Sequence, residues 1–363
     1  MLNVRISKTS KTLVALLMGG IGVGFGLLGM AKSKLHLNTV SVMTYNVENL
    51  FDTTHDRGKT DYTFLPLEEK KTKEHKQTCL LIKVKKWRDE CLDLDWSEKQ
   101  LQQKLENLRS VILSVNQGRG PDVLVLQEVE NEIVLRRLAK IMPEANYQEF
   151  VLIEGNDIRG IDVAMLSRLP LKKPAILHEI PFENMKSSDR MDTRGILEAN
   201  FDLGNQQTLT VYGVHFPAPY HDRTYRLQAL ERLAMLRNQH AKNHLVIAAG
   251  DFNITSDEDE KYNPLSVLGE EWKASHKIKT LNHEGTNYYP PKKNWSYLDM
   301  MLFSQAWFDR QGWELNVDSV RVIDQAVGQV DSQGRPNRFD PTKGEGVSDH
   351  LPIFAYLQLK SAL

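Results

Sequence analysis

Residues 123–129 read Val-Leu-Val-Leu-Gln-Glu-Val, a run of four apolar residues followed at once by an amide and a carboxylate. Such a run, bounded at its start by Gly120-Pro121-Asp122, is typical of a strand buried on both faces. Leu245–Ala249 has the same character and is followed closely by an acid, Asp251. Strands of this kind lie beneath other layers, so these segments predict a layered α/β domain.

Further strands and three helices can be placed around these two runs. The helices are expected after Ser97 as N-cap, over residues 131–142, and from Asp222 onward. The expected strands are Val40–Val47 and residues 147–153, 161–167, 194–202, 207–215, 297–303, 317–323 and 351–358. Strands alternate with helices, and neighbouring strands form hairpin-like pairs. This order predicts two mixed sheets packed together with helices outside.

Composition excludes some classes of protein and leaves others open. Of the 363 residues, 41% are hydrophobic, which excludes a disordered chain. Lys plus Arg number 46 against 47 Asp plus Glu, so the net charge is close to zero. A protein held on nucleic acid by bulk attraction is usually basic, whereas a hydrolase that contacts a phosphodiester briefly has no such requirement. The charge therefore neither supports nor rejects a nucleic-acid substrate.

The N-terminus carries a targeting signal. Basic residues before residue 12 precede Leu13–Ala31, a stretch of 19 residues without a charge. Residues 1–31 are predicted to be a signal peptide cleaved before Lys32, or an N-terminal membrane anchor that associates through residues 13–31. Both predict export: to the periplasm, into the medium, or to the outer face of the inner membrane. Residues 32–363 are then one domain.

Residues 57–96 are polar and highly charged, which predicts a partly helical surface insertion. Both cysteines of the chain, Cys79 and Cys91, lie in it, and they either pair or remain free thiols. Its basic residues form either a solvated face or a patch that contacts a phosphate backbone. They are Lys83, Lys85, Lys86 and Arg88.

Several predicted strands end abruptly in a carboxylate, amide or imidazole. These residues are Asn46, Glu128, His215, Asp251 with Asn253, and Asp349 with His350. Each alone could begin a turn, but strand ends in layered α/β folds gather at a rim where ligands bind. Carboxylate and amide oxygens suit a hard cation such as Mg²⁺ or Mn²⁺, and histidines move protons. The set therefore predicts metal-assisted hydrolysis of a phosphoester.

Short blocks around these residues resemble the signature of a known superfamily. The blocks are Thr44-Tyr45-Asn46-Val47-Glu48-Asn49, Leu126-Gln127-Glu128-Val129, Asp157 to Ala164, Val214-His215-Phe216-Pro217, Gly250-Asp251-Phe252-Asn253 and Ser348-Asp349-His350. In this order they resemble the endonuclease/exonuclease/phosphatase superfamily, which is deoxyribonuclease-I-like, and in particular its exported bacterial nucleases. The resemblance covers about residues 39–358. It implies a four-layered α/β sandwich of two packed mixed β-sheets flanked by helices.

The resemblance also implies roles for individual residues. Glu128 would be the principal ligand of Mg²⁺ or Mn²⁺, with Asn46 and Asp349 at the same cation. His350 would be a general base for water or a donor to the phosphate, and Asp299 would hold its tautomer. The residues expected near the scissile phosphate, the nucleophile and the leaving oxygen are Asp251, Asn253 and His215.

Basic residues near the site admit two interpretations each. Arg168, Arg159 and Arg194 either reach a phosphate or form ion pairs. Asp157 likewise has either a role at the site or a structural role in an ion pair. His221, Asp222 and Arg226 are assigned to a helix start.

The leading functional prediction is an exported nuclease that cleaves DNA or RNA, with nucleic acid as substrate and no protein partner indicated. The alternative is a phosphatase or a phosphodiesterase for a lipid headgroup or a small phosphoester. A scaffold without catalysis would be expected to have lost Glu128, Asp251 or His350, and all three are present.

Overall fold

The computed structural model describes residues 37–310 and 312–360. The predicted leader, residues 1–31, lies outside the described residues. Within the described ranges, no helix is both long enough and apolar enough to span a bilayer.

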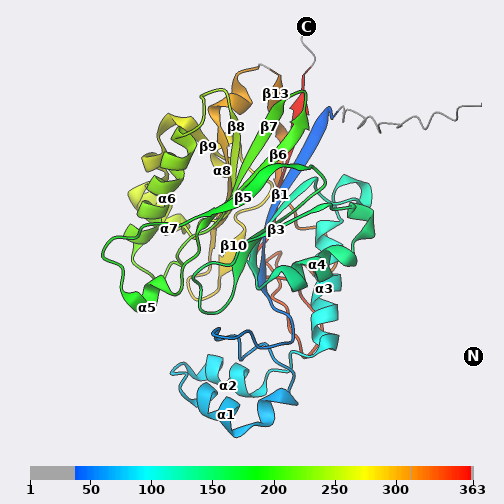
Figure 1. Ribbon diagram of the computed structural model, residues 1–363, viewed down its shortest axis with the longest axis vertical. Helices are drawn as coiled ribbons and strands as arrows, with labels where there is room; N and C mark the ends of the chain where they lie inside the picture. Colours follow the sequence, from blue (N-terminus) through cyan, green and yellow to red (C-terminus); the bar gives the residue numbers. More distant parts are fainter. Residues whose placement is uncertain (1–36, 311, 361–363) are drawn as a thin grey trace, which may run out of the picture. The chain divides into compact units, whose positions relative to one another are not determined.

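Two six-stranded sheets form the centre of the domain (Figure 1). The first has the order β13-β14-β1-β2-β4-β3, and the second β5-β6-β7-β8-β12-β9. Strands β1 and β2 pair in parallel, as do β7 and β8, whereas the other pairs are antiparallel, so both sheets are mixed.

The strand bounds of the first sheet are β1 Thr39–Leu50, β2 Val123–Val129, β3 Glu149–Leu152, β4 Asp162–Ser167, β13 Trp313–Val322 and β14 Ile353–Leu359. Those of the second sheet are β5 Leu171–His178, β6 Ile196–Gly204, β7 Gln207–His215, β8 Leu245–Asp251, β9 Trp272–Ala274 and β12 Asp299–Ser304. A separate hairpin consists of β10 Asn287–Tyr289 and β11 Asn294–Ser296.

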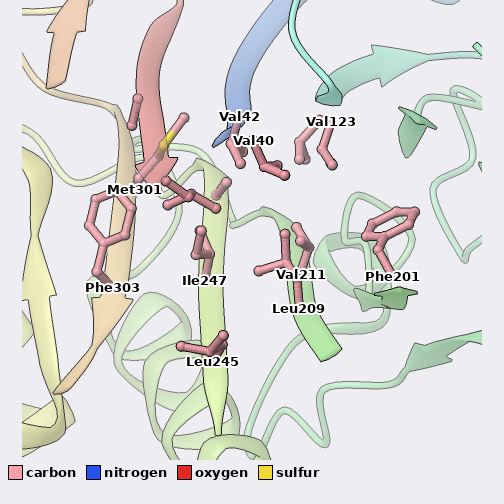
Figure 2. Close-up of a cluster of buried hydrophobic side chains, with 14 of the residues drawn as sticks. Val40, Val42, Val123, Phe201, Leu209, Val211, Leu245, Ile247, Met301 and Phe303 are labelled. Atoms are coloured by element: carbon pink, nitrogen blue, oxygen red, sulfur yellow. The ribbon is translucent and has the colours of Figure 1, made fainter. Parts of the chain in front are cut away.

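The main hydrophobic core lies between the two sheets. Figure 2 shows Val40 and Val42 of β1 directed toward Val211 and Ile247 of the second sheet, with Met301 beside them. All five side chains are fully buried. Because the strands β2 and β8 bury side chains on both faces, each sheet also needs a cover on its outer side.

Helices provide that cover. Helices α3 (Glu98–Ile112) and α4 (Glu132–Lys140) pack on the outer face of the first sheet through a second buried cluster. Helix α6 (Arg223–Asn238) covers the second sheet through a third cluster. Besides α1 and α2 of the 57–96 insertion, the remaining helices are α5 Ser187–Arg190, α7 Ser256–Tyr262, α8 Ser275–Ile278 and the 3-10 segments η1 Glu69–Lys71, η2 Asn116–Gly118, η3 Pro143–Ala145, η4 Pro264–Glu271 and η5 Gln305–Phe308. The predicted four-layered α/β sandwich is confirmed.

The predicted strands and helices are present, with bounds shifted by a few residues. Asp222 caps α6 as expected, because its side chain accepts from the Thr224 N–H at 2.9 Å. Ser97 precedes α3, but its hydroxyl makes no capping bond to the backbone. Strand β5 was not predicted, because this edge strand is largely exposed and contains Pro174.

The 57–96 insertion contains α1 (Lys73–Leu80) and α2 (Lys85–Asp93), which Figure 1 shows beyond one end of the sheets. Cys79 and Cys91 form a disulfide that joins the two helices, which resolves the choice left open by the sequence. The Lys70 side chain is buried and donates to the carbonyls of Thr63 (2.7 Å) and Leu94 (2.6 Å). The insertion is therefore polar outside but has an ordered interior.

Candidate active site

Three of the predicted site residues lie side by side across the second sheet. His215 ends β7, Asp251 ends β8 and Asp299 begins β12. The strand register pairs His215 with Asp251 and Asp251 with Asp299. The three side chains therefore form one row at the same edge of the sheet.

Two strands of the first sheet contribute a second row through bulges. Asn46 of β1 pairs with Gln127 of β2, and the regular register is lost between Asn46 and Leu50. Glu128, Glu48 and Asn49 have positive φ angles of 67°, 52° and 55°. A bulge leaves residues out of the ladder and redirects their side chains, and such backbone strain is concentrated at functional sites.

The segment Gly250-Asp251-Phe252-Asn253 is shaped by its backbone. Gly250 has φ +152°, and a Cβ there would lie 2.0 Å from the Val214 carbonyl oxygen, so no larger residue fits. Asn253 donates its N–H to the Asp251 carboxylate at 2.8 Å and its side-chain amide to the Phe216 carbonyl at 2.9 Å. These bonds fix the Asp251 carboxylate toward the row.

His350 joins the row from the loop before β14. Its Nδ1 lies 2.6 Å from Asp299 Oδ2, and its backbone N–H donates to the Ser348 hydroxyl, which donates to the Asn46 carbonyl at 2.7 Å. Burial lowers the pKa of His350, but Asp299, Asp349 and Asp251 outweigh burial and hold that pKa well above its usual value. These carboxylates therefore favour the protonated imidazole.

Asn46 connects the two sheets at the site. Its Nδ2 donates to Glu128 Oε1 at 3.2 Å and to Asp251 Oδ2 at 3.1 Å. His215 Nε2 lies 3.9 Å and 3.7 Å from the same two oxygens. Asp349 Oδ1 lies 3.8 Å from His350 Nε2. The structure thus brings together predicted residues that are up to 304 positions apart in the chain, from Asn46 to His350.

The donor set fits a hard divalent cation. One ligand atom each from Asp251, Asp299 and His350 lies within 4.8 Å of the other two, and this cluster includes none of the predicted ligands Glu128, Asn46 and Asp349. Burial, with a further contribution from Asp299, raises the pKa of Asp251 to about 7, although His350 and the hydrogen bonds from Asn253 and Asn46 act in the opposite direction. At this site, Asp299 Oδ1 and His215 Nδ1 belong to the buried atoms of the described residues that have no hydrogen-bond partner. A cation with part of its water shell would relieve both conditions.

Glu48 and Arg338 are site residues that the sequence analysis did not assign. Arg338 Nε lies 2.5 Å from Glu48 Oε1, and its Nη2 lies 3.7 Å from Asp349 Oδ2. Burial, and then Asp349, raise the pKa of Glu48 to about 7, and burial lowers the pKa of the nearby Lys104 to about 8. Glu48 belongs to the Thr44–Asn49 segment that resembles the family signature, so the sequence contained an indication that it lies at the site. Arg338 lies in no such segment.

The basic residues with two interpretations divide into two groups. Arg168 pairs with Asp122 at 2.9 Å and donates to three carbonyls, so it is structural. Arg159, 42% exposed, lies 3.2 Å from Asp157 and 3.0 Å from Asp192, and Arg194 pairs with Asp157 in the interior. Burial lowers the pKa of His215 well below its usual value, and the positive charges of Arg194 and Arg159 act in the same direction.

The predicted helix-start residues also hold together. Arg226 pairs with Glu258 in the interior, and His221 contacts Asp192 at 2.9 Å. Asp192 also lies 3.0 Å from Arg159 and 3.7 Å from Arg194, so its contact with His221 places the start of α6 next to these two arginines.

Comparison of the sequence with protein-family models assigns the chain to a family. The profile of the Endonuclease/Exonuclease/phosphatase family matches residues 89–359. The chain belongs to that family. Members of the endonuclease/exonuclease/phosphatase family are hydrolases that act on phosphoester bonds and generally use divalent metal ions. The match begins after Asn46 and Glu48, and the tertiary structure places both residues beside Glu128 and Asp349 of the matched range.

Solved structures of the endonuclease/exonuclease/phosphatase type share the fold. TDP2 from D. rerio, complexed with single strand DNA product, has a TM-score of 0.55 at 15% identity, over 88% of this chain and 99% of that one. A family protein from Bacteroides thetaiotaomicron gives 0.52 at 13% identity, over 89% and 98% of the chains. One from Beutenbergia cavernae gives 0.52 at 15%, over 90% and 73%. A search of curated protein sequences finds no match.

Proposed function

We propose that this protein is a nuclease that hydrolyses phosphodiester bonds in DNA or RNA with an activated water and a bound Mg²⁺ or Mn²⁺. The observation that carries the proposal is the hydrogen-bonded group formed by Glu128, Asn46 and Asp251 beside the His350–Asp299 pair. It combines oxygen ligands, a buried carboxylate and an oriented imidazole, which are the parts that phosphodiester hydrolysis requires.

Glu128, with Asn46 and Asp349, would hold the cation. Such a cation would neutralise charge that develops on the phosphate. The Asn46 amide nitrogen faces Glu128 and Asp251, and its oxygen accepts from the Glu48 N–H at 3.0 Å. Because an amide oxygen has two acceptor positions, Asn46 could keep these bonds, which hold the two carboxylates together, and still offer its oxygen to a cation.

Proton transfer is divided between His350 and Asp251 in this proposal. The protonated His350 suits a donor to a phosphate oxygen, since Asp299 occupies its Nδ1 and leaves Nε2 for the substrate. Asp251, with a pKa of about 7, suits the base that takes the proton of the attacking water. The neutral His215 can donate near the leaving oxygen, and Asn253 keeps Asp251 in place.

Nucleic acid is the proposed substrate for two reasons. Arg159 and Arg338 are 42% and 58% exposed, and although each is paired with carboxylates, a phosphate could contact either guanidinium. The fold is shared with D. rerio TDP2, whose structure contains a single strand DNA product.

A second candidate is a phosphodiesterase for a lipid headgroup. Docking on a bilayer requires exposed apolar side chains, and the β10–β11 hairpin offers Tyr289, which is 53% exposed. However, Tyr288 packs against Trp295 at 5.2 Å between ring centroids, and Trp295 packs against His283 at 4.6 Å. Aromatic rings that pack on one another present less surface to a membrane, so the nuclease is preferred.

The test is a cleavage assay with a chain that begins at Lys32. Plasmid DNA and RNA are incubated with Mg²⁺, with Mn²⁺ or with EDTA, and phospholipid vesicles are assayed in parallel. We expect cleavage of nucleic acid with either ion, none in EDTA, and a loss of roughly 100-fold or more in Glu128→Ala and in His350→Ala. Glu106→Ala, at an exposed acid on α3, is the control. Turnover of vesicles alone would reverse the order of the two candidates.

Export is proposed as well. The uncharged stretch 13–31 supports it, and so does the Cys79–Cys91 disulfide, because disulfides persist mainly in oxidising compartments. Fractionation of cells that express the full chain, with mass determination of the N-terminus, distinguishes a cleaved leader from an anchor. Recovery of the uncleaved chain in the cytoplasm would contradict this proposal.

A further inference from the structure

A cleft of about 350 Å³ opens beside the candidate site and is built from three distant parts of the chain. One wall belongs to the 57–96 insertion, the opposite wall to the loop at 338–342, and the floor includes Lys104 of α3. Glu48 and Asn49 line the end of the cleft that faces the site, and the Asn49 N–H donates to Glu128 at 2.9 Å. The cleft is therefore continuous with the group that would hold the cation.

The walls are rich in aromatic side chains. Phe64 and Trp96 come from the insertion, and Phe339 comes from the facing loop. Trp96 contacts Phe64 and Phe339 edge to face, with centroid distances of 5.4 Å and 5.9 Å. Lys104 Nζ lies 5.3 Å from the centre of the Phe339 ring. The Lys104 side chain is buried. Phe64 and Phe339 are half-buried, and because one face of the Phe64 ring stacks on Phe51 at 4.0 Å between centroids, only the remaining part of that ring is available to the cleft.

The charges in the cleft are balanced. Its basic residues are Lys86, Lys104 and Arg338, and its acidic residues are Glu48, Glu90 and Asp340. Arg338 is held by Glu48 at 2.5 Å, and Lys86 lies 3.8 Å from Glu90. A ligand with several phosphates would meet no excess of positive charge here. A planar, weakly charged group fits the aromatic walls better.

We propose that this cleft binds the nucleoside adjacent to the scissile phosphate, with its base against Phe339 and Phe64. The inference rests on the proposed nuclease function and adds a subsite to it. The cleft volume is at the low end for small-molecule sites, which is room for one nucleoside rather than several. Stacking on an aromatic ring tolerates any base, because every base has a π-face. The 57–96 insertion would then contribute one wall of the nucleoside subsite, through Phe64 and Trp96.

The kinetic test compares two phosphodiesters that share a leaving group. Thymidine 5′-(4-nitrophenyl phosphate) carries a nucleoside, whereas methyl 4-nitrophenyl phosphate does not. We expect Phe339→Ala to raise KM for the thymidine substrate roughly tenfold with little change in kcat, and to leave the methyl substrate unaffected. Phe339→Tyr should restore the KM, and Phe339→Leu should not. Tyr262→Ala, at an exposed aromatic residue that does not line the cleft, is the matched control.

A binding measurement separates this inference from the proposed function. Calorimetry is carried out with a thymidine dinucleotide and Mg²⁺ in a His350→Ala background, where turnover does not interfere. Adding Phe339→Ala should weaken binding roughly tenfold. Equal affinity with and without Phe339, or equal effects on both ester substrates, would overturn the subsite even if the enzyme is a nuclease. Absence of turnover by the unmodified protein, with Phe339-dependent binding intact, would instead contradict only the proposed catalysis.

Stability must be checked in parallel, because Phe339 also packs against the second core cluster. Thermal unfolding of the Phe339→Leu and Phe339→Tyr variants should agree with that of the unmodified protein within a few degrees. A weaker affinity in Phe339→Leu at unchanged stability then supports stacking rather than loss of fold. Unchanged affinity in that variant would contradict it.

Discussion

His350 Nδ1 lies 2.6 Å from Asp299 Oδ2, and this contact joins the two sheets of the sandwich. Asp299 is the first residue of β12 in the second sheet, and His350 precedes β14 of the first. The imidazole is thus held by a carboxylate that belongs to the opposite sheet. A change in sheet packing would alter the site directly.

Asp299→Asn should lower kcat by a factor of roughly 10² to 10⁴ with the fold intact. The asparagine amide can donate to His350 Nδ1, which favours the wrong tautomer and removes the charge that stabilises the imidazolium. The assay is turnover of a nitrophenyl diester, together with the imidazole N–H resonances in NMR spectra. Met300→Leu, at the next residue of β12, is the control and should stay within about twofold. Full activity of Asp299→Asn would exclude Asp299 as the positioning residue for His350.

Asp251→Asn should stabilise the metal-free protein while abolishing turnover. Because the folded state raises the pKa of Asp251 from 3.8 to about 7, its ionisation destabilises the fold, increasingly as the pH rises from 3.8 to 7 and fully above that. At pH 8 in EDTA we expect a gain of about 1–2 kcal/mol in the free energy of unfolding, measured with urea. Addition of Mg²⁺ should narrow the gap, since only the unmodified protein keeps the full site.

The control for this measurement is Asp318→Asn, at an exposed acid on β13, which should change stability by less than about 0.5 kcal/mol. If Asp251→Asn is less stable than the unmodified protein in EDTA, the surroundings do not destabilise the ionised Asp251 carboxylate, and no cation is needed to compensate its charge.

Removal of the disulfide should lower stability by about 3 kcal/mol in the chain-entropy description, because the bridge closes a loop with a sequence separation of 12. The double variant Cys79→Ser/Cys91→Ser and the reduced protein should agree in urea unfolding. Reducing agent should not affect the double variant. If reduction leaves the unmodified protein unchanged, the bridge contributes nothing to the fold.

Glu198→Gln should cost stability at neutral pH but not in strong acid. Glu198 accepts from Asn200 at 2.7 Å and lies 2.7 Å from His178 and 3.0 Å from Lys173. Burial raises the pKa of Glu198, but these partners outweigh it and hold that pKa at about 2, below its ordinary 4.5. The stabilisation of roughly 2–3 kcal/mol is therefore complete above pH 4.5 and is lost as the pH falls toward 2.

Urea unfolding between pH 7 and pH 3 measures this effect. The difference between Glu198→Gln and the unmodified protein should be constant down to about pH 4.5 and then shrink. Glu179→Gln, at an exposed neighbour, should show no such change. A difference that grows in acid would contradict the sign of the shift.

Local patterns in the sequence were sufficient for the layers of this protein. Apolar runs such as Val123–Leu126 and the amphipathic spacing of α3 identify buried strands and covering helices, because burial on a given face imposes a fixed period. The strand-end residues Glu128, Asp251 and His350 were also predicted as site residues, because several apolar strands end in a carboxylate, amide or imidazole and strand ends gather at one rim of a layered fold. Edge strand β5 escaped, because an exposed strand needs no apolar pattern.

What the tertiary structure alone decided is which of these residues touch, and which others join them. The Asn46 bridge between Glu128 and Asp251 depends on a bulge in β1 and on the packing of two sheets, neither of which is encoded locally. Arg338 reaches Glu48 across 290 positions, and the insertion meets the 338–342 loop to form the cleft. Sequence fixes which faces must be buried, whereas the relative placement of distant loops follows only from the way those faces pack.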